Sequence, residues 1–371
     1  MSWRRETYST GDGSQPSSLA IGDFNNDTRS DIVVTNPGTN SVGVFLSFNY
    51  VTFGHETIYA TGFTAASYSL AIGDFNHDNQ SDIVVANSER ANIGIFLGYK
   101  NGTFSTQTKY STGSKSKPQY VAIGDFNNDD HLDVVVVNND KANIGIFLGY
   151  GNGTFAGQTA YSTGSKSDPY YVAIGDFDHD TNQDIVVAQY GTHNIGIFLG
   201  YGDGNFSTPS IYSTGAESKP ASVTTGDLNN DSHLDIIVAN YGKDNIGVLF
   251  GYGNATFSAL TMYSTDAGSN PVCVTVIDIN NDDQLDIVVV NEGTYNIGIF
   301  FGYGNGTFGD MHSYLMGYDS RPYSVAVGDF NNDSWIDMAV TNYGTDNVEI
   351  ILQTCYFYSS TISIHRNYIA C

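Results

Sequence analysis

The stretch Asp125-Phe126-Asn127-Asn128-Asp129-Asp130-His131-Leu132-Asp133 recurs along the chain with small changes. Its opening aspartate has six counterparts, and neighbouring copies are 51 residues apart: Asp23, Asp74, Asp176, Asp227, Asp278 and Asp329. A tyrosine outside the stretch keeps the same spacing from Tyr8 to Tyr314. Seven uninterrupted copies span nearly all 371 residues, which indicates one array of equivalent structural units.

Each copy contains four short runs suited to β-strands. In the third copy these runs are 120–126, 133–138, 143–148 and 154–161, which are rich in Val, Ile, Phe and Tyr and are bounded by turn residues. The run Val134-Val135-Val136-Val137 is continuously apolar, as in strands covered on both faces. This pattern predicts an all-β fold, a seven-bladed β-propeller of four-stranded blades. The alternative is a β-solenoid, although its coils are usually shorter than 51 residues.

The last copy lacks a fourth strand. The third copy continues Gly149-Tyr150-Gly151-Asn152-Gly153-Thr154-Phe155, whereas the last continues Gln353-Thr354-Cys355-Tyr356-Phe357-Tyr358-Ser359. The Tyr-Ser-Thr-Gly signature of the other fourth strands occurs at 8–11 with no strands before it. We therefore expect the N-terminal strand to complete the seventh blade and close the ring, with 361–364 as the alternative closing strand. The propeller is predicted over 1–353, followed by a C-terminal tail over 354–371.

The recurring stretch is an acidic loop between the first two strands of each blade. Loop positions 1, 5 and 9 are Asp in all seven copies, and position 3 is Asn in six copies and Asp178 in the fourth. Calcium takes six to eight oxygen ligands, which three carboxylates, one amide, the position 7 carbonyl and water would supply. Magnesium requires stricter octahedral geometry, and zinc prefers His and Cys, which do not recur at these positions.

We therefore predict up to seven Ca²⁺ ions, one for each blade. The predicted ligands are Asp23, Asn25, Asp27, Asp31, Asp74, Asn76, Asp78, Asp82, Asp125, Asn127, Asp129, Asp133, Asp176, Asp178, Asp180, Asp184, Asp227, Asn229, Asp231, Asp235, Asp278, Asn280, Asp282, Asp286, Asp329, Asn331, Asp333 and Asp337. Asn and Asp also form turns without any ion, which is the alternative for a single loop. An EF-hand is rejected because flanking helices and a Glu at loop position 12 are missing.

The charge of the chain supports cation binding. Of its 39 acidic residues, 22 occupy the predicted ligand positions, and crowded carboxylates repel one another unless a cation lies between them. Seven calcium ions would change the net charge from −25 to −11. The negative charge argues against nucleic acid as a partner and against adsorption to anionic lipid.

The repeat resembles the FG-GAP/VCBS repeats. The resemblance is carried by Ala122-Ile123-Gly124-Asp125-Phe126-Asn127-Asn128-Asp129, by Leu132-Asp133-Val134-Val135-Val136 and by Asn152-Gly153-Thr154-Phe155, and it covers nearly the entire chain. Such repeats build the propeller heads of integrin α subunits and of many secreted or surface proteins. The resemblance implies calcium at loop positions 1, 3, 5 and 9.

Two departures from the family pattern matter. The Gly-Ala-Pro signature of integrins is absent, so the chain is a generic repeat protein. Position 6, usually Gly, holds Thr28, Asn79, Asp130, Thr181, Ser232, Asp283 and Ser334. If position 6 needs a positive φ, Asn and Asp tolerate it better than Thr and Ser, so we expect weaker calcium binding in blades 1, 4, 5 and 7.

The face opposite the acidic loops is the predicted ligand surface. Strands alternate in direction, so this face holds the loops between the second and third strands and the connections between blades. Eight of the 14 Lys and Arg residues fall there, together with several tyrosines. Because loops carry function and Tyr is frequent at binding hot spots, we predict Tyr190, Tyr241 and Tyr343 as ligand-binding residues. Ordinary variation of solvated loops is the alternative.

No common catalytic motif occurs, so we expect that the chain is not an enzyme. A protein-binding adhesion or interaction module is the first hypothesis. A carbohydrate-binding lectin is the alternative, and a polysaccharide-active enzyme is the third. We expect a monomer. We expect no direct membrane insertion, because no run of about 18 apolar residues occurs.

We expect an extracellular or cell-surface location from the calcium demand, although no signal peptide is found. Sequons before the fourth strands, at Asn101, Asn152, Asn205, Asn254 and Asn305, predict a glycoprotein, with Asn-Gly as a hairpin turn signal as the alternative. Cys273 is expected to be buried in a strand, and Cys355 and Cys371 are candidates for pairing.

Overall fold

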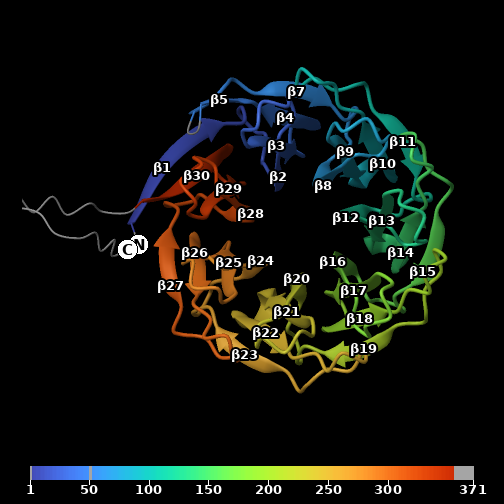
Figure 1. Ribbon diagram of the computed structural model, residues 1–371, viewed down its shortest axis with the longest axis vertical. Helices are drawn as coiled ribbons and strands as arrows, with labels where there is room; N and C mark the ends of the chain where they lie inside the picture. The colour runs from blue at the N-terminus through green and yellow to red at the C-terminus, as the bar shows by residue number, and fades with distance from the viewer. Residues whose placement is uncertain (1, 50–51, 355–371) are drawn as a thin grey trace, which may run out of the picture.

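The computed structural model describes residues 2–49 and 52–354 and contains seven four-stranded antiparallel sheets arranged as blades around a central axis (Figure 1). This arrangement confirms the predicted seven-bladed β-propeller. In six blades the strands pair in sequence order, in the seventh β1 takes the fourth place, and the first strand of each repeat lies nearest the axis. None of the described segments is a helix long and apolar enough to cross a membrane.

The bounds of the strands repeat closely from blade to blade. Blades 1 to 3 consist of β2 (Ser18–Gly22), β3 (Asp31–Asn36), β4 (Ser41–Phe45) and β7 (Thr57–Ala60); β8 (Ser67–Gly73), β9 (Asp82–Asn87), β10 (Asn92–Phe96) and β11 (Thr108–Ser111); and β12 (Pro118–Gly124), β13 (Asp133–Asn138), β14 (Asn143–Phe147) and β15 (Thr159–Ser162). Blades 4 and 5 consist of β16 (Pro169–Gly175), β17 (Asp184–Gln189), β18 (Asn194–Phe198) and β19 (Ser210–Ser213); and β20 (Pro220–Gly226), β21 (Asp235–Asn240), β22 (Asn245–Leu249) and β23 (Thr261–Ser264).

The last two blades complete the ring. Blade 6 consists of β24 (Pro271–Ile277), β25 (Asp286–Asn291), β26 (Asn296–Phe300) and β27 (His312–Leu315), and blade 7 of β28 (Pro322–Gly328), β29 (Asp337–Asn342), β30 (Asn347–Thr354) and β1 (Ser2–Ser9). Outside the blades, β5 (Ser47–Asn49) pairs with β6 (Thr52–Phe53), and short 3₁₀ turns cover Ser88–Arg90, Asn139–Lys141 and Tyr241–Lys243.

The fourth strand is shorter than the sequence pattern predicts. In the third blade it covers Thr159–Ser162 rather than 154–161. Phe155 instead forms an isolated bridge with Gly149, so the chain from 149 to 155 is a turn. The predicted boundary was wrong because Phe155 is apolar for a different reason: its ring is buried against the preceding blade.

The hydrophobic core lies between blades. Val134 and Val136 pack toward the second blade, in the same cluster as Phe75 and Ile95. Val135 and Val137 pack toward the fourth blade. Successive strand residues point to opposite faces, so both faces of each sheet are covered and the second strands are continuously apolar.

The N-terminal strand closes the ring. β1 pairs antiparallel with β30 over eight residues, from Ser2 opposite Thr354 to Ser9 opposite Asn347, which confirms the predicted closure. A side-chain ion pair between Arg5 and Glu349 (3.1 Å) joins the two strands. The alternative closing strand at 361–364 lies outside the described residues, as do Cys355 and Cys371, whereas Cys273 is buried and unpaired.

Deletion of residues 1–10 should lower the melting temperature by roughly 10 °C or more, because it removes a full strand and exposes the edge of blade 7. The measurement is thermal unfolding followed by circular dichroism in calcium. The comparison variant lacks residues 355–371 and keeps the β1–β30 pairing, so its loss should be smaller. An unchanged melting temperature after deletion of 1–10 would contradict closure by β1.

A half-buried carboxyl group distinguishes the first blade from its neighbours. The Nδ2 atom of Asn36 donates to Glu56 (2.7 Å), whereas the equivalent asparagines of blades 2 and 3 donate to Gln107 (3.1 Å) and Gln158 (3.2 Å). Burial raises the pKa of Glu56 to about 7, and the Asn36 hydrogen bond opposes this shift. Glu56 therefore becomes an ionised, half-buried group near neutral pH.

Glu56→Gln should raise stability at pH 8 and leave it nearly unchanged at pH 5. Folding raises the pKa of Glu56 from about 4.5 to about 7, so the folded state favours the protonated carboxyl group. The contribution of Glu56 to folding stability is therefore fully present below pH 4.5 and is lost as pH rises through about 7. The expected gain at pH 8 is about 1–2 kcal/mol in urea unfolding, after allowance for solvent screening. Gln107→Glu is the reciprocal control and should introduce the same pH dependence; parallel pH profiles of wild type and Glu56→Gln would refute the assignment.

Candidate metal centres and ligand surface

A buried aspartate at position 9 ends every acidic loop. In the third blade, the carboxylate of Asp133 accepts hydrogen bonds from the backbone N–H groups of Phe126 (2.9 Å) and Gly149 (2.7 Å). Phe126 belongs to the acidic loop, and Gly149 begins the turn after β14. The equivalent aspartates of the other blades make the same pair of bonds: Asp31, Asp82, Asp184, Asp235, Asp286 and Asp337. In blades 1 to 6, position 9 therefore joins the acidic loop to the segment after the third strand, and in blade 7 it joins the acidic loop to Gln353 in β30.

The aspartate at position 1 shapes the loop backbone. In the third blade, Asp125 accepts hydrogen bonds from the N–H groups of Asp129 (3.2 Å) and Asp130 (2.8 Å). Positions 4 and 6 have positive φ in all seven loops, with values from 56° to 74°. Thr28 and Thr181 adopt this conformation as Asp130 does, at a cost of about 1 kcal/mol for a residue with a Cβ atom. The backbone shape is thus common to all seven loops, and weaker calcium binding in blades 1, 4, 5 and 7 stays a prediction.

Positions 3 and 5 bring further oxygens to the loop. The side-chain nitrogen of Asn127 donates to the carboxylate of Asp129 (2.9 Å), and the Oδ1 atom of Asn127 is buried without a hydrogen-bond partner. The same amide–carboxylate contact recurs in blades 2, 5, 6 and 7. The first blade differs, because Arg29 at position 7 forms an ion pair with Asp27. There a side chain of the protein itself neutralises one candidate ligand.

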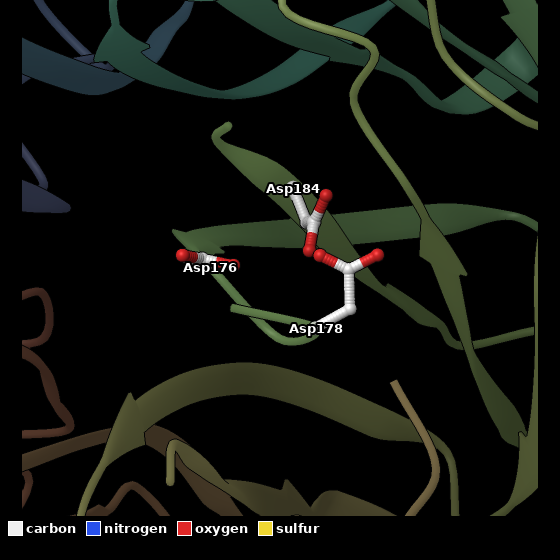
Figure 2. Close-up of side chains that lie close together, drawn as sticks. All are labelled: Asp176, Asp178 and Asp184. Carbon is white, nitrogen blue, oxygen red and sulfur yellow. The ribbon is translucent and has the colours of Figure 1, made fainter. Parts of the chain in front are cut away.

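The fourth blade carries the densest group of carboxylates. One oxygen from each of Asp176, Asp178 and Asp184 lies within 4.8 Å of the others. Figure 2 shows the carboxyl groups of Asp178 and Asp184 turned toward each other, with Asp176 beside them. The Oδ1 atom of Asp176 is buried and has no hydrogen-bond partner. Burial, followed by the neighbouring Asp180, raises the pKa of Asp178.

Ionisation of the aspartates at position 9 is unfavourable in the folded protein. Burial raises their pKa to about 6 in blades 2 to 6 and to about 7 for Asp337, although backbone N–H groups oppose the shift. The aspartates at positions 1, 3 or 5 of the same loop raise it further in each of these blades. A cation among these oxygens would offset both effects. The hard oxygen donors and the unpartnered oxygens of Asn127 and Asp176 fit calcium.

The face opposite the acidic loops has a groove lined mainly by tyrosines. Tyr190 and Tyr241 line a groove of about 420 Å³ together with Tyr170, Tyr323 and Glu292. The ring centroids of Tyr170 and Tyr190 are 5.8 Å apart, and those of Tyr190 and Tyr241 are 6.3 Å apart. These side chains come from the loops and strand ends opposite the acidic loops. We refer to Tyr170, Tyr190, Tyr241, Tyr323 and Tyr343 as the tyrosine surface.

Tyr343 joins this surface through its neighbour Tyr323, with ring centroids 6.1 Å apart. The hydroxyl groups of Tyr323 and Tyr170, from blades 7 and 4, lie 2.8 Å apart and so link opposite parts of the ring. Arg321 lies over the ring of Tyr343 at 5.4 Å and pairs with Glu292. The structure therefore places the three predicted ligand tyrosines on one continuous surface, and their role in binding stays a prediction.

Several contacts on both faces escaped the sequence analysis. Glu292 and Asp168 line the tyrosine groove, but no motif or repeat in the sequence indicates them. On the loop face, His77 contacts His131 (2.8 Å), and Asn128 contacts Asn182 (2.9 Å), across neighbouring blades. Each pair joins loop position 4 to position 7 of the next blade. The signal was present in the sequence as a separation of 54 residues, one repeat plus three.

The chain belongs to the FG-GAP-like repeat family, which it matches at residues 23–85, 74–136, 131–187, 180–238, 227–289 and 278–340. The family resemblance seen in the sequence is thereby confirmed. No curated protein matches the chain. The fold and the family support a propeller that acts as an interaction module.

Solved structures with the same fold have different functions. Virginiamycin B lyase from Staphylococcus aureus is 14% identical, with a TM-score of 0.70 over 95% of this chain and 100% of that chain. A lectin from Agrocybe aegerita that recognises non-reducing terminal N-acetylglucosamine is 17% identical, with a TM-score of 0.59 over 88% and 86%. BBS1N, solved in complex with ARL6DN, is 11% identical, with a TM-score of 0.63 over 95% and 96%. At these identities the likeness concerns the fold alone.

The expectation that the chain is not an enzyme requires correction. The lyase structures show an enzyme with the same propeller fold, including one catalytically inactive variant solved with quinupristin. The expectation was wrong because it relied on linear motifs that belong to other folds. In a propeller, loops from several blades meet on one face, so residues that act together need not be close in sequence.

Proposed function

We propose that this protein is a calcium-stabilised β-propeller that binds a partner protein through its tyrosine surface. The observation that carries the proposal is the half-buried row of tyrosines around the groove of about 420 Å³, on the face opposite the acidic loops. Tyrosines offer large contact areas at low conformational cost and are frequent at binding hot spots.

Charged side chains around the tyrosines favour a protein partner. Lys219 lies 5.7 Å from the ring centroid of Tyr190, Arg321 lies over Tyr343, and Asp168 and Glu292 line the groove. An aromatic centre with a rim of both charges is typical of protein interfaces. The charges would fix the orientation of the partner, while the tyrosines would supply most of the binding energy.

A glycan is the second candidate ligand. Aromatic rings beside a carboxylate can stack on a sugar and accept hydrogen bonds from its hydroxyl groups, and Tyr190 with Glu292 offers this combination. The lectin of the same fold adds to this candidate only by fold analogy.

Calcium would be held by loop positions 1, 3, 5 and 9, and its chemistry is the neutralisation of crowded carboxylates. Position 9 would gain most, because its carboxylate is buried whether or not a cation is near it. We propose an extracellular or cell-surface location, because modules there meet calcium at concentrations that fill sites with dissociation constants of about 10⁻⁴–10⁻³ M.

Removal of calcium with a chelator should lower the melting temperature strongly, since each filled site contributes about 2.7 kcal/mol at a hundredfold excess over its Kd. Asp178→Asn gives the fourth loop the same residue types as the third at positions 1, 3, 5 and 9. We expect this variant to be more stable than wild type without calcium and to gain less on adding it. Asn127→Asp is the reciprocal control in the third blade. Equal melting temperatures with and without calcium would contradict the proposal that calcium stabilises the fold.

A triple variant, Tyr190→Ser, Tyr241→Ser and Tyr343→Ser, should lose binding while keeping its calcium-dependent melting temperature. The probes are arrays of purified extracellular proteins and of glycans, incubated with labelled protein. The matched control changes Tyr99, Tyr150 and Tyr201, which are 53%, 58% and 61% exposed on the loop face. A protein hit lost only in the first variant supports the proposal, and a glycan hit lost there supports the second candidate. Equal loss in both triple variants would contradict the tyrosine surface as the binding site.

A further inference from the structure

A phenylalanine seals six of the seven junctions between blades. Phe155, from the turn before the fourth strand of blade 3, packs against Phe75 (5.4 Å between ring centroids) and Tyr110 (5.6 Å) of blade 2. The turn is also fixed by a hydrogen bond from the N–H of Gly153 to the carbonyl of Phe75 (2.8 Å). Equivalent phenylalanines seal five other junctions: Phe53, Phe104, Phe206, Phe257 and Phe308.

Within residues 2–49 and 52–354, the junction between blades 6 and 7 has no equivalent phenylalanine. Because β1 supplies the fourth strand of blade 7, no turn leads from β30 to that strand. Gln353 stands where the other blades begin the turn, and its N–H makes the expected bond to Asp337 (2.7 Å). With its amide nitrogen turned inward, the Gln353 side chain donates to the carbonyl of Ile279 (3.0 Å). This bond replaces the backbone bond of the missing turn, but Gln353 brings no aromatic ring.

An open groove of about 480 Å³ remains at this junction. Its aromatic lining consists of Trp3, Phe301, Tyr314 and Trp335, and Asn280, His312 and Gln353 add polar groups. Trp3 packs against Tyr314 with ring centroids 6.3 Å apart and so covers part of the surface that a phenylalanine would cover. Trp3 and Trp335 are also the two tryptophans of the chain.

We propose that the segment Tyr356-Phe357-Tyr358 of the C-terminal tail binds in this groove. The described chain leaves β30 at Thr354, next to Gln353 in the groove wall. Phe357 lies three residues beyond Thr354, a reach of about 10 Å in extended chain. Three consecutive aromatic residues thus begin beside an aromatic groove that lacks the ring present at the other junctions.

The covalent connection favours this occupant over a second copy of the chain. A segment tethered a few residues from its site has an effective concentration in the millimolar range, well above that of a second molecule in dilute solution. Binding of the segment would give the seventh junction an aromatic seal like the other six. β1 and the tail would then close the ring from both ends of the chain.

The test uses tryptophan fluorescence in calcium, because both tryptophans line the groove. In the full chain, we expect blue-shifted emission that is shielded from acrylamide. The variant Tyr356→Ser, Phe357→Ser and Tyr358→Ser should raise the quenching constant about twofold, because side chains that were buried regain contact with solvent. Ile362→Ser with Ile364→Ser is the matched control in the same tail and should leave the quenching constant unchanged.

Deletion of residues 355–371 should give the same increase as the aromatic variant, and a synthetic peptide of residues 354–366 should reverse it. Near-ultraviolet circular dichroism checks that each variant is folded, and the peptide result holds even if the deletion lowers stability. Two results would overturn the proposal: quenching that is equal in the full chain and the aromatic variant, or shielding that appears only as protein concentration rises, which would indicate a second copy in the groove.

Discussion

The buried carboxylate at loop position 9 is the contact on which the rest of this propeller depends. In each blade it accepts one backbone N–H from the acidic loop and one from the start of the segment after the third strand, as Asp133 does from Phe126 and Gly149. Hydrogen bonds to a charged acceptor are worth about 1.5–3 kcal/mol, and a carboxylate left without them would carry a large desolvation cost. The same side chain therefore joins the two loops of a blade and makes the acidic loop adopt one shape.

This arrangement also explains why one face of the protein is so acidic. A carboxylate buried for structural reasons has a raised pKa, and the neighbouring aspartates raise it further, as at Asp82 and Asp235. A chain that only needed the hydrogen bonds would gain by neutral side chains at positions 1 and 5. Their retention as Asp in all seven loops is physically reasonable if a cation lies among them. In the first blade, Arg29 supplies part of that positive charge from within the chain.

The sequence predicted what repeats and missed what arises between repeats. The 51-residue period gave the blades, and the signature at Tyr8 gave the closing strand, because both depend on local pattern. The contact between Tyr170 and Tyr323 joins residues 153 positions apart, and only the closed ring brings them together. The predicted start of the fourth strand was wrong because Phe155 is a buried turn residue, and in sequence such a residue is as apolar as a strand residue. The absence of catalytic motifs was no argument against an enzyme for a related reason, since a site assembled from several blades would leave no contiguous signature.

Equivalence between blades is also the clearest guide to where function is located. Strands and acidic loops vary little because each must fit the same neighbours, so a change in one copy costs stability without a compensating gain. The loops bearing Tyr190 and Glu292 repeat a backbone contact, in which their N–H groups donate to the carbonyls of Asp168 and Asn270. Because that contact uses backbone atoms, the side chains of these loops are free to differ. Ring closure breaks the equivalence at one further place, the junction of blades 6 and 7, because a ring made from one chain must join its ends somewhere. There the fourth strand of blade 7 comes from the N-terminus, so the turn that carries the phenylalanine is missing. Trp3 packs against Tyr314 and Gln353 donates to the carbonyl of Ile279, and these two contacts replace part of what the phenylalanine turn provides at the other junctions.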